Sequence, residues 1–109
     1  MKRSEIWTVA GGGAYTSKPR PAVIVQDDAF AERDSITLCP LTTDPADAPV
    51  FRIPVEPSSR NGLSSRSWLM ADKLSTVPRE RLGSRIGQLE DDLLLRLNRS
   101  ILVFLGLAR

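Results

Sequence analysis

The chain contains no histidine, and this absence excludes several kinds of site. Imidazole is the usual general base near neutral pH and a common zinc ligand, and pairs of histidines cleave RNA in some enzymes. Any catalysis must therefore use other groups, and a metal site would depend on carboxylates alone. The acidic residues form no compact motif of the kind that holds magnesium or calcium, so we expect neither a metal nor a cofactor.

Cysteine and long apolar segments are also scarce. The single cysteine, Cys39, lies in the apolar run Ile36-Thr37-Leu38-Cys39, which favours a buried structural thiol and excludes an intrachain disulfide. The amino-terminal segment resembles no signal peptide, and no apolar stretch is long enough to span a bilayer. We therefore expect a cytoplasmic protein that does not enter a membrane.

Length and composition indicate a small folded protein. The chain has 109 residues, of which 41% are hydrophobic and 26% are charged, which is typical of a folded domain. We expect one domain over residues 1–109. Because a domain of this size leaves much of its surface uncovered, we expect a homodimer, and a pocket between two subunits is plausible.

Short apolar runs separated by turn residues predict a small antiparallel sheet. Gly11-Gly12-Gly13 is expected to be a hairpin loop, since no Gly-Lys-Ser/Thr follows it as a phosphate loop requires. Asn61-Gly62 is a strong turn signal. We expect strands at 5–10, 21–26, 35–41, 50–55 and 67–74, with a possible continuation at 76–77, a helical turn at 27–31, a loop at 42–49 and a turn around Gly83 and Gly87.

A helix is predicted over residues 90–105, because the stretch contains neither glycine nor proline and Gly106 follows it. Its predicted core face consists of Leu94, Leu97, Ile101, Phe104 and Leu105. Trp68 and Phe51 could stack on bases, but strand aromatics are more often core, and we expect both in the core. The fold class is α+β, with a small antiparallel barrel and a carboxyl-terminal helix.

The segment Lys18-Pro19-Arg20-Pro21 precedes a strand, and Thr42 and Thr43 end the next one. An arginine held by flanking prolines presents a fixed fork of donors to a phosphate, and hydroxyls beside it can complete an anion cradle. The alternative is that Arg20 is an ordinary edge-strand charge and that the threonines are turn residues.

The order of motifs along nearly the whole chain resembles the MazF/PemK family of toxin endoribonucleases. The motifs are Ser4-Glu5-Ile6-Trp7, Arg20-Pro21-Ala22-Val23-Ile24-Val25, Pro40-Leu41-Thr42-Thr43, Asn61-Gly62-Leu63, Ala71-Asp72-Lys73-Leu74-Ser75-Thr76-Val77, Arg85-Ile86-Gly87-Gln88-Leu89 and Leu105-Gly106-Leu107. The resemblance implies a small SH3-like barrel (CcdB/MazF-like). It also implies metal-independent cleavage of single-stranded RNA by a homodimer that a cognate antitoxin inhibits.

The resemblance also suggests roles for individual residues. Arg20 matches the family arginine at the scissile phosphate, and Thr42 matches the catalytic threonine or serine. Thr43 matches a hydroxyl used in RNA contact. Asp72 matches an aspartate implicated as a base in some members, and Glu5 matches an acidic residue near the cleft. Lys18 is a further candidate for RNA binding or catalysis. Asp72 could equally form a surface ion pair with its neighbours.

The sequence departs from the family pattern in two places. Ala14, Tyr15 and Thr16 stand where some members have an acid or a histidine, and Met70 replaces an arginine two residues before Asp72. The identities of the general acid and base therefore stay open.

The implied reaction is transesterification, in which the ribose 2′-hydroxyl attacks phosphorus and leaves a 2′,3′-cyclic phosphate and a 5′-hydroxyl. The main alternative is a non-enzymatic CcdB-like gyrase-binding toxin, whose carboxyl-terminal Trp-Gly-Ile type ending is absent here, where the chain ends Leu107-Ala108-Arg109. A third alternative is an inactive relative that only sequesters an antitoxin.

Overall fold

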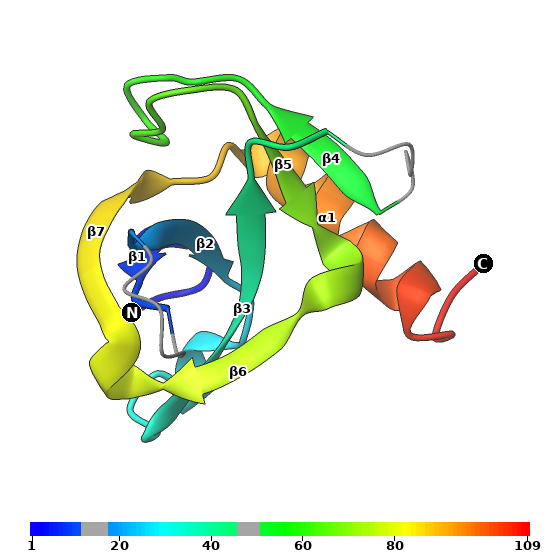
Figure 1. Cartoon of the computed structure of the whole chain (residues 1–109). Helices are drawn as coiled ribbons and strands as arrows, with labels where there is room; N and C mark the ends of the chain where they lie inside the picture. The colour runs from blue at the N-terminus through cyan, green and yellow to red at the C-terminus, as the bar shows by residue number, and fades with distance from the viewer. Residues whose placement is uncertain (12–17, 46–50) are drawn as a thin grey trace.

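A computed structural model describes residues 1–11, 18–45 and 51–109, which form a curled sheet and one long helix (Figure 1). The strands are β1 (Glu5–Val9), β2 (Arg20–Ile24), β3 (Ser35–Thr42), β4 (Arg52–Val55), β5 (Ser67–Met70), β6 (Ser75–Pro78) and β7 (Leu82–Gln88). Three short 3-10 helices are η1 (Asp28–Phe30), η2 (Ala71–Lys73) and η3 (Arg79–Arg81), and the helix α1 spans Asp91–Phe104. The predicted glycine loop and residues 14–16 lie largely outside the described residues, as do 46–50.

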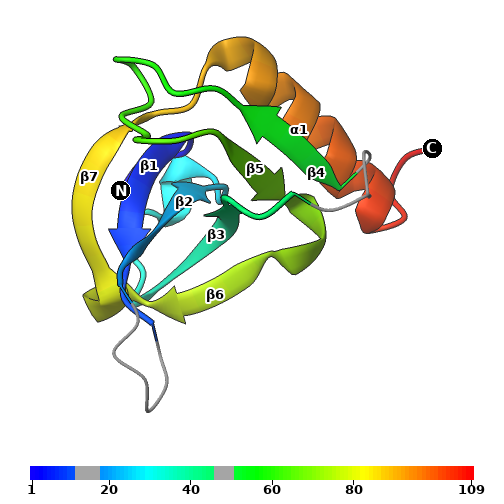
Figure 2. The ribbon, with the colours of Figure 1, turned by 45° about the horizontal axis from the view of Figure 1, so that its top comes forward.

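The sheet is antiparallel, with strand order β4-β5-β3-β2-β1-β7, and β6 pairs with β3 off this path. Figure 2 shows β1, β2 and β3 side by side, with β7 beyond β1. The long strand β3 changes partner along its length: Ser35 to Leu38 pair with β6, whereas Leu41 and Thr42 pair with β5. This exchange curls the sheet and confirms the predicted α+β barrel with a carboxyl-terminal helix.

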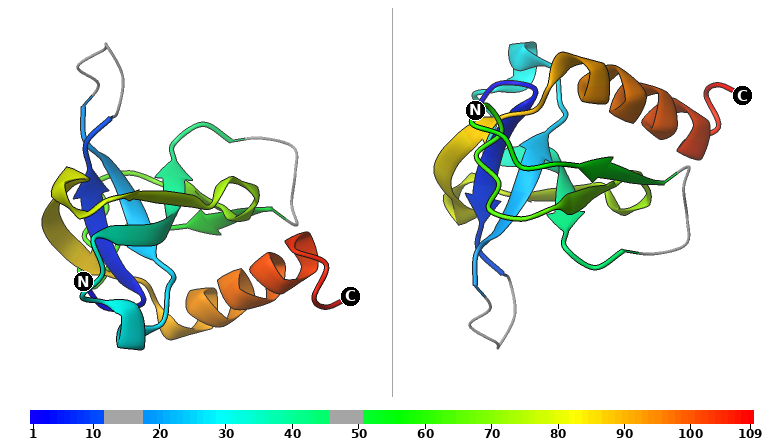
Figure 3. Two further views of the ribbon diagram at one scale, coloured as in Figure 1. Left: turned by 90° about the horizontal axis from the view of Figure 1, so that it is seen from below. Right: turned by 90° about the horizontal axis from the view of Figure 1, so that it is seen from above.

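Two apolar clusters fill the two faces of the sheet. In the first, α1 packs Leu97 against strand residues such as Ile53 and Leu69, all with no exposed surface. Figure 3 shows α1 lying along one side of the strands. The second cluster lies on the opposite face of β2 and β3, where β6 and β7 contribute Val77 and Leu82. Because successive strand residues point to opposite faces, each of β2 and β3 contributes to both clusters.

Cys39 is fully buried, as predicted, and burial raises the pKa of its thiol to about 12. A thiol in this state is a structural apolar side chain and not a nucleophile. None of the helices in the described part of the chain is long and apolar enough to cross a membrane.

Some local expectations were wrong. The segment around Gly83 and Gly87 is strand β7 and not a turn, and the predicted fifth strand ends at Met70, where η2 begins. Phe104 and Leu105 are 44% and 54% exposed, because α1 extends past the strands that cover Leu97. Trp68 and Phe51, both expected in the core, are only half-buried and belong to neither apolar cluster.

Candidate active site

The pairing of β2 with β3 brings Arg20 and Thr42 to the same end of the sheet. The last described pair of this ladder is Ala22 with Pro40, and Arg20 and Thr42 each lie two residues beyond it, where Arg20 pairs with Val9 and Thr42 pairs with Trp68. Residues two apart on a strand project from the same face of the sheet. The two residues with the strongest predicted roles therefore share one end and one face of the sheet.

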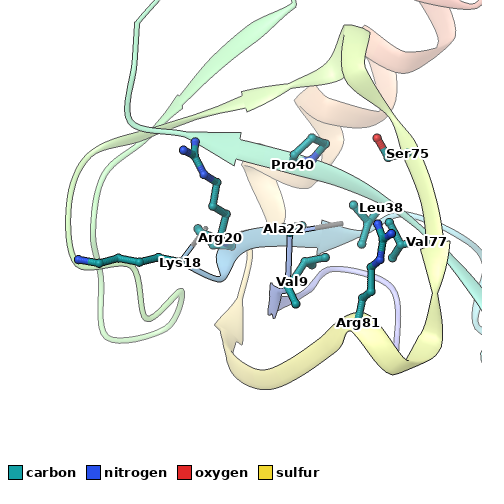
Figure 4. A pocket seen from close by; sticks show the side chains of 12 residues that line it. Val9, Lys18, Arg20, Ala22, Leu38, Pro40, Ser75, Val77 and Arg81 are labelled. Carbon is teal, nitrogen blue, oxygen red and sulfur yellow. The ribbon is translucent and has the colours of Figure 1, made fainter. Parts of the chain in front are cut away.

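A cavity of about 230 Å³ lies on this face, and we call it the cationic cavity (Figure 4). Figure 4 shows Lys18 and Arg20 toward one end and Arg81 toward the other. The remaining lining is mostly apolar and comes from β1, β2, β3 and β6: Val9, Ala10, Gly11, Pro21, Ala22, Leu38, Pro40, Ser75 and Val77. No carboxylate is among the lining residues that the structure describes, so the cavity favours an anionic ligand.

Arg20 is exposed, and among residues 1–11, 18–45 and 51–109 its guanidinium forms no ion pair. Proline on each side restricts the backbone that carries it. The five donors of a guanidinium match two oxygens of one phosphate. Arg20 is therefore positioned to accept a phosphate from solvent without first breaking a described contact.

Thr42 is half-buried at the end of β3, where it pairs with Trp68. Its Oγ1 accepts a hydrogen bond of 3.1 Å from the amide of Asp44, which is the turn role considered from sequence. A hydroxyl has one donor and two acceptor positions, so this bond leaves the hydroxyl hydrogen available. The turn contact and a donor role toward a phosphate oxygen are therefore compatible.

Thr43 is not among the residues that line the cationic cavity. It lines a second cavity, together with Pro19, Pro21 and residues of the 62–67 segment. Thr42, the last residue of β3, is among the lining residues of neither cavity. The two threonines are neighbours in the sequence, but only Thr43 lines the second cavity.

Glu5 lies at the opposite end of β1 from the cavity. Val9 pairs with Arg20, and Glu5 is four residues back along the strand, which corresponds to about 13 Å. Partial burial raises the pKa of Glu5, but hydrogen bonds from the Lys2 amide and the Trp7 indole, with the positive charges of the amino terminus and Arg85, outweigh it and lower the pKa overall. The structure thus gives Glu5 structural partners and does not bring it to Arg20.

Asp72 lies in η2 and forms an ion pair with Arg52 of β4. Both side chains are largely buried, with 25% of Asp72 and 11% of Arg52 exposed. The partner is neither Lys73 nor another sequence neighbour, because β4 and β5 pair Arg52 with Met70 and so bring it beside η2. Asp72 is not among the residues lining the cationic cavity, and its role as a base stays a prediction.

Arg81 and Ser75 line the cationic cavity but were missed from sequence. Arg81 belongs to η3, and its carbonyl accepts a 2.9 Å hydrogen bond from Ala10, which ties η3 to the end of β1. The only sequence signal was a run of charged residues, Arg79-Glu80-Arg81, which does not reveal which side chain turns inward. Its position depends on the pairing of β7 with β1, which was also missed.

The described residues contain no group of three or more His, Cys, Asp or Glu side chains that could hold a metal ion. The site has positive charge at both ends of an apolar floor, and the Thr42 hydroxyl lies at the same end of the sheet as Arg20. Such an arrangement can bind a phosphodiester and stabilise negative charge on its oxygens.

The chain is similar to known proteins over nearly its whole length. A family model described as PemK-like, MazF-like toxin of type II toxin-antitoxin system matches residues 2–105. A probable endoribonuclease MazF of Mycolicibacterium smegmatis is 50% identical over 108 residues, which cover 99% of each chain.

Similar solved structures share the fold at lower identity. One is an endoribonuclease in complex with its cognate antitoxin from Mycobacterial species, with a TM-score of 0.82 and 21% identity, covering 100% of this chain and 98% of that one. Another is the Mycobacterium tuberculosis toxin MazF-mt6, with a TM-score of 0.80 and 24% identity, covering 96% of this chain and 99% of that one.

Proposed function

Because the chain belongs to the PemK-like, MazF-like toxins of type II toxin–antitoxin systems, we propose that it is an endoribonuclease that cleaves single-stranded RNA without a metal. The observation that carries this proposal is the exposed Arg20 guanidinium, which borders a cavity lined by cations and lies at the same end of the β2–β3 pair as Thr42. We place its action in the cytoplasm, where a toxin of this type meets RNA.

The reaction that we propose is transesterification within the RNA. The 2′-oxygen forms a bond to the adjacent phosphorus, the bond from phosphorus to the 5′-oxygen breaks, and one proton passes from the 2′-hydroxyl to the leaving 5′-oxygen. Arg20 neutralises charge that accumulates on the non-bridging oxygens, and the Thr42 hydroxyl donates one further hydrogen bond. A single preorganised donor of this kind commonly contributes about 2.7–4 kcal/mol to catalysis.

Two features support metal independence. The attacking hydroxyl belongs to the substrate, so no metal is needed to generate a nucleophile from water. The described residues bring no three candidate metal ligands together, whereas Lys18, Arg20 and Arg81 supply positive charge where a divalent ion would otherwise be needed.

Incubation of the purified protein with a long single-stranded RNA in EDTA tests the proposal. We expect fragments that carry a 2′,3′-cyclic phosphate and a 5′-hydroxyl, identified by mass spectrometry. A substrate with a single 2′-deoxy nucleotide at the cleavage position should stay intact there. Activity that requires magnesium, or cleavage of the 2′-deoxy substrate, would contradict the mechanism, and a CcdB-like gyrase-binding toxin would leave RNA intact throughout.

The partner that we propose is an antitoxin whose disordered acidic and apolar tail covers the cationic cavity. The lining supports this choice, because carboxylates would complement Arg20 and Arg81 while apolar side chains contact the floor between them. An antitoxin bound in this way competes with RNA. Full binding of the antitoxin with undiminished RNA cleavage would refute this placement.

We also propose that the protein is a homodimer. The second half of α1 and the residues after it expose large apolar side chains, namely Leu102 (43%), Phe104 (44%), Leu105 (54%) and Leu107 (71%). On the sheet face opposite α1, Trp68 and Met70 are half-buried. The exposed apolar side chains at the end of α1 are typical of an interaction site.

A further inference from the structure

The second cavity, to which Thr43 contributes, has a different chemical character from the cationic cavity. We call it the hydroxyl cavity, and its volume is about 230 Å³. Its hydroxyl-bearing lining residues include Thr43, Ser64 and Ser65, and its apolar walls are formed by residues such as Leu63 and Ile86. No charged side chain is among its described lining residues.

The two cavities lie on opposite faces of the β1–β2 ribbon. Val9 and Arg20 pair and border the cationic cavity, whereas the next pair, Thr8 and Pro21, faces the hydroxyl cavity. Residues from the start of β2 line both cavities. Pro21 lines both, so the cavities are separated by little more than one residue of β2.

The three exposed hydroxyls of the hydroxyl cavity are free to bind a ligand. Within the described ranges, the side chains of Thr43, Ser64 and Ser65 form no hydrogen bond with the protein. By contrast, the buried Ser67 uses its Oγ to donate to the Ser65 carbonyl at 3.0 Å, and Thr8 Oγ1 accepts from the Ser84 amide at 2.9 Å. A planar ligand between apolar walls would thus meet unpaired donors and acceptors at its edge.

The segment that forms the outer wall, residues 57–66, is rigidly attached to the rest of the protein. Fully buried Asn61 donates to the Glu56 carbonyl at 2.8 Å and accepts from the Leu63 amide at 3.0 Å. Gly62 has a φ of +70°, and a Cβ there would lie 2.0 Å from the Ile86 carbonyl oxygen. The wall is therefore preformed, which lowers the entropy that binding would cost.

We propose that the hydroxyl cavity binds one unpaired nucleobase, adjacent to the phosphate at Arg20, and sets the base preference at that single position. The inference rests on the proposed function, because it assigns a part of the same RNA. RNA carries its charge on phosphates and presents neutral, planar bases with donors and acceptors at their edges. The three cations of the cationic cavity suit the phosphates, and the uncharged hydroxyls of the hydroxyl cavity suit the edge of a base.

The test uses a random-sequence single-stranded pool in which every ribose is 2′-O-methylated, so that the strand binds without reacting. Sequencing of the retained molecules gives the base preference at each position for the wild type and three variants. Ser64→Phe fills the cavity, Thr43→Val removes one hydroxyl at nearly constant shape, and Ser59→Phe is a matched control, since exposed Ser59 is on the same segment but does not line the cavity.

We expect the wild type and Ser59→Phe to share a preference that Ser64→Phe weakens about tenfold at one position only, which is the scale of one base-specific pair of hydrogen bonds. Thr43→Val should weaken the same position to a smaller extent. Unchanged base preference in both cavity variants overturns the inference. An unmodified RNA pool tested in parallel separates the two proposals, because cleavage with unchanged preference refutes only the cavity's role, whereas no cleavage refutes the function.

Discussion

Replacement of Asn61 by alanine should strongly destabilise the protein, because this side chain uses its full hydrogen-bonding capacity in a site with no exposed surface. Its Oδ1 accepts from the amides of Ser58 and Leu63, both at 3.0 Å. Its Nδ2 donates to the Glu56 carbonyl at 2.8 Å and to Glu90 Oε1 at 3.1 Å. Alanine removes all of these contacts and leaves the amide of buried Leu63 without its partner.

At a net value of about 1 kcal/mol for each of these hydrogen bonds, Asn61→Ala should lower the free energy of unfolding by about 4 kcal/mol. For a domain of this size the melting temperature should fall by roughly 16 °C or more. Urea unfolding followed by circular dichroism measures the loss, and exposed Ser59→Ala, as the control, should change stability by no more than ~0.5 kcal/mol. A loss below about 1 kcal/mol for Asn61→Ala would show that the 57–66 segment is not held as described.

Three further predictions concern acid stability, catalysis and assembly. Partial burial raises the pKa of Glu90, but hydrogen bonds from Ser58 and Asn61 and the charge of Arg60 outweigh it, so the pKa is lowered. Ionised Glu90 therefore stabilises the fold above about pH 4.3, and this stability is lost as the pH falls through the pKa of the folded state. In melting experiments at a series of pH values, Glu90→Gln should reduce the loss of stability in acid. Because the chain has no histidine, the single-turnover cleavage rate should be nearly independent of pH from about pH 5.5 to 7. A pH-dependent rate with a midpoint of about 6.5, which disappears in Asp72→Asn, would instead assign Asp72 as the base. Sedimentation at micromolar concentration should show a dimer that Leu107→Glu weakens, since Leu107 is 71% exposed, and a monomeric wild type would contradict the assembly.

The sequence predicted the strands whose apolar pattern is regular and missed the one whose pattern is not. Strand β7 contains Gly83 and Gly87, which read as turn residues. In the structure they permit close approach: a Cβ on Gly83 would lie 2.7 Å from Thr8 Oγ1, and one on Gly87 would lie 2.3 Å from the Asn61 carbonyl. A glycine required by a distant segment cannot be distinguished locally from a glycine required by a turn.

Site residues that lie at the ends of neighbouring strands could be predicted from the sequence. Site residues whose positions depend on the pairing of distant segments could not. Arg20 and Thr42 lie at the same end of the sheet because Arg20 begins β2 and Thr42 ends the neighbouring antiparallel strand β3, and this follows from local pattern and order. The Arg52–Asp72 ion pair depends on the register of β4 with β5, and the inward position of Arg81 depends on β7. The sequence predicted Asn61 only as a turn residue, since no local signal shows that its side chain is buried and donates a hydrogen bond to Glu90.

The central claim is that Arg20 stabilises the reacting phosphate. Its most direct test is the single-turnover rate of RNA cleavage in EDTA for Arg20→Ala and Arg20→Lys, with exposed Arg99→Ala as a charge-matched control and melting curves to establish equal folding. We predict a loss of about 10²–10³-fold or more for Arg20→Ala, an intermediate rate for Arg20→Lys, which keeps the charge but not the fork of donors, and a wild-type rate for Arg99→Ala. Equal rates for Arg20→Ala and the wild type would contradict the account.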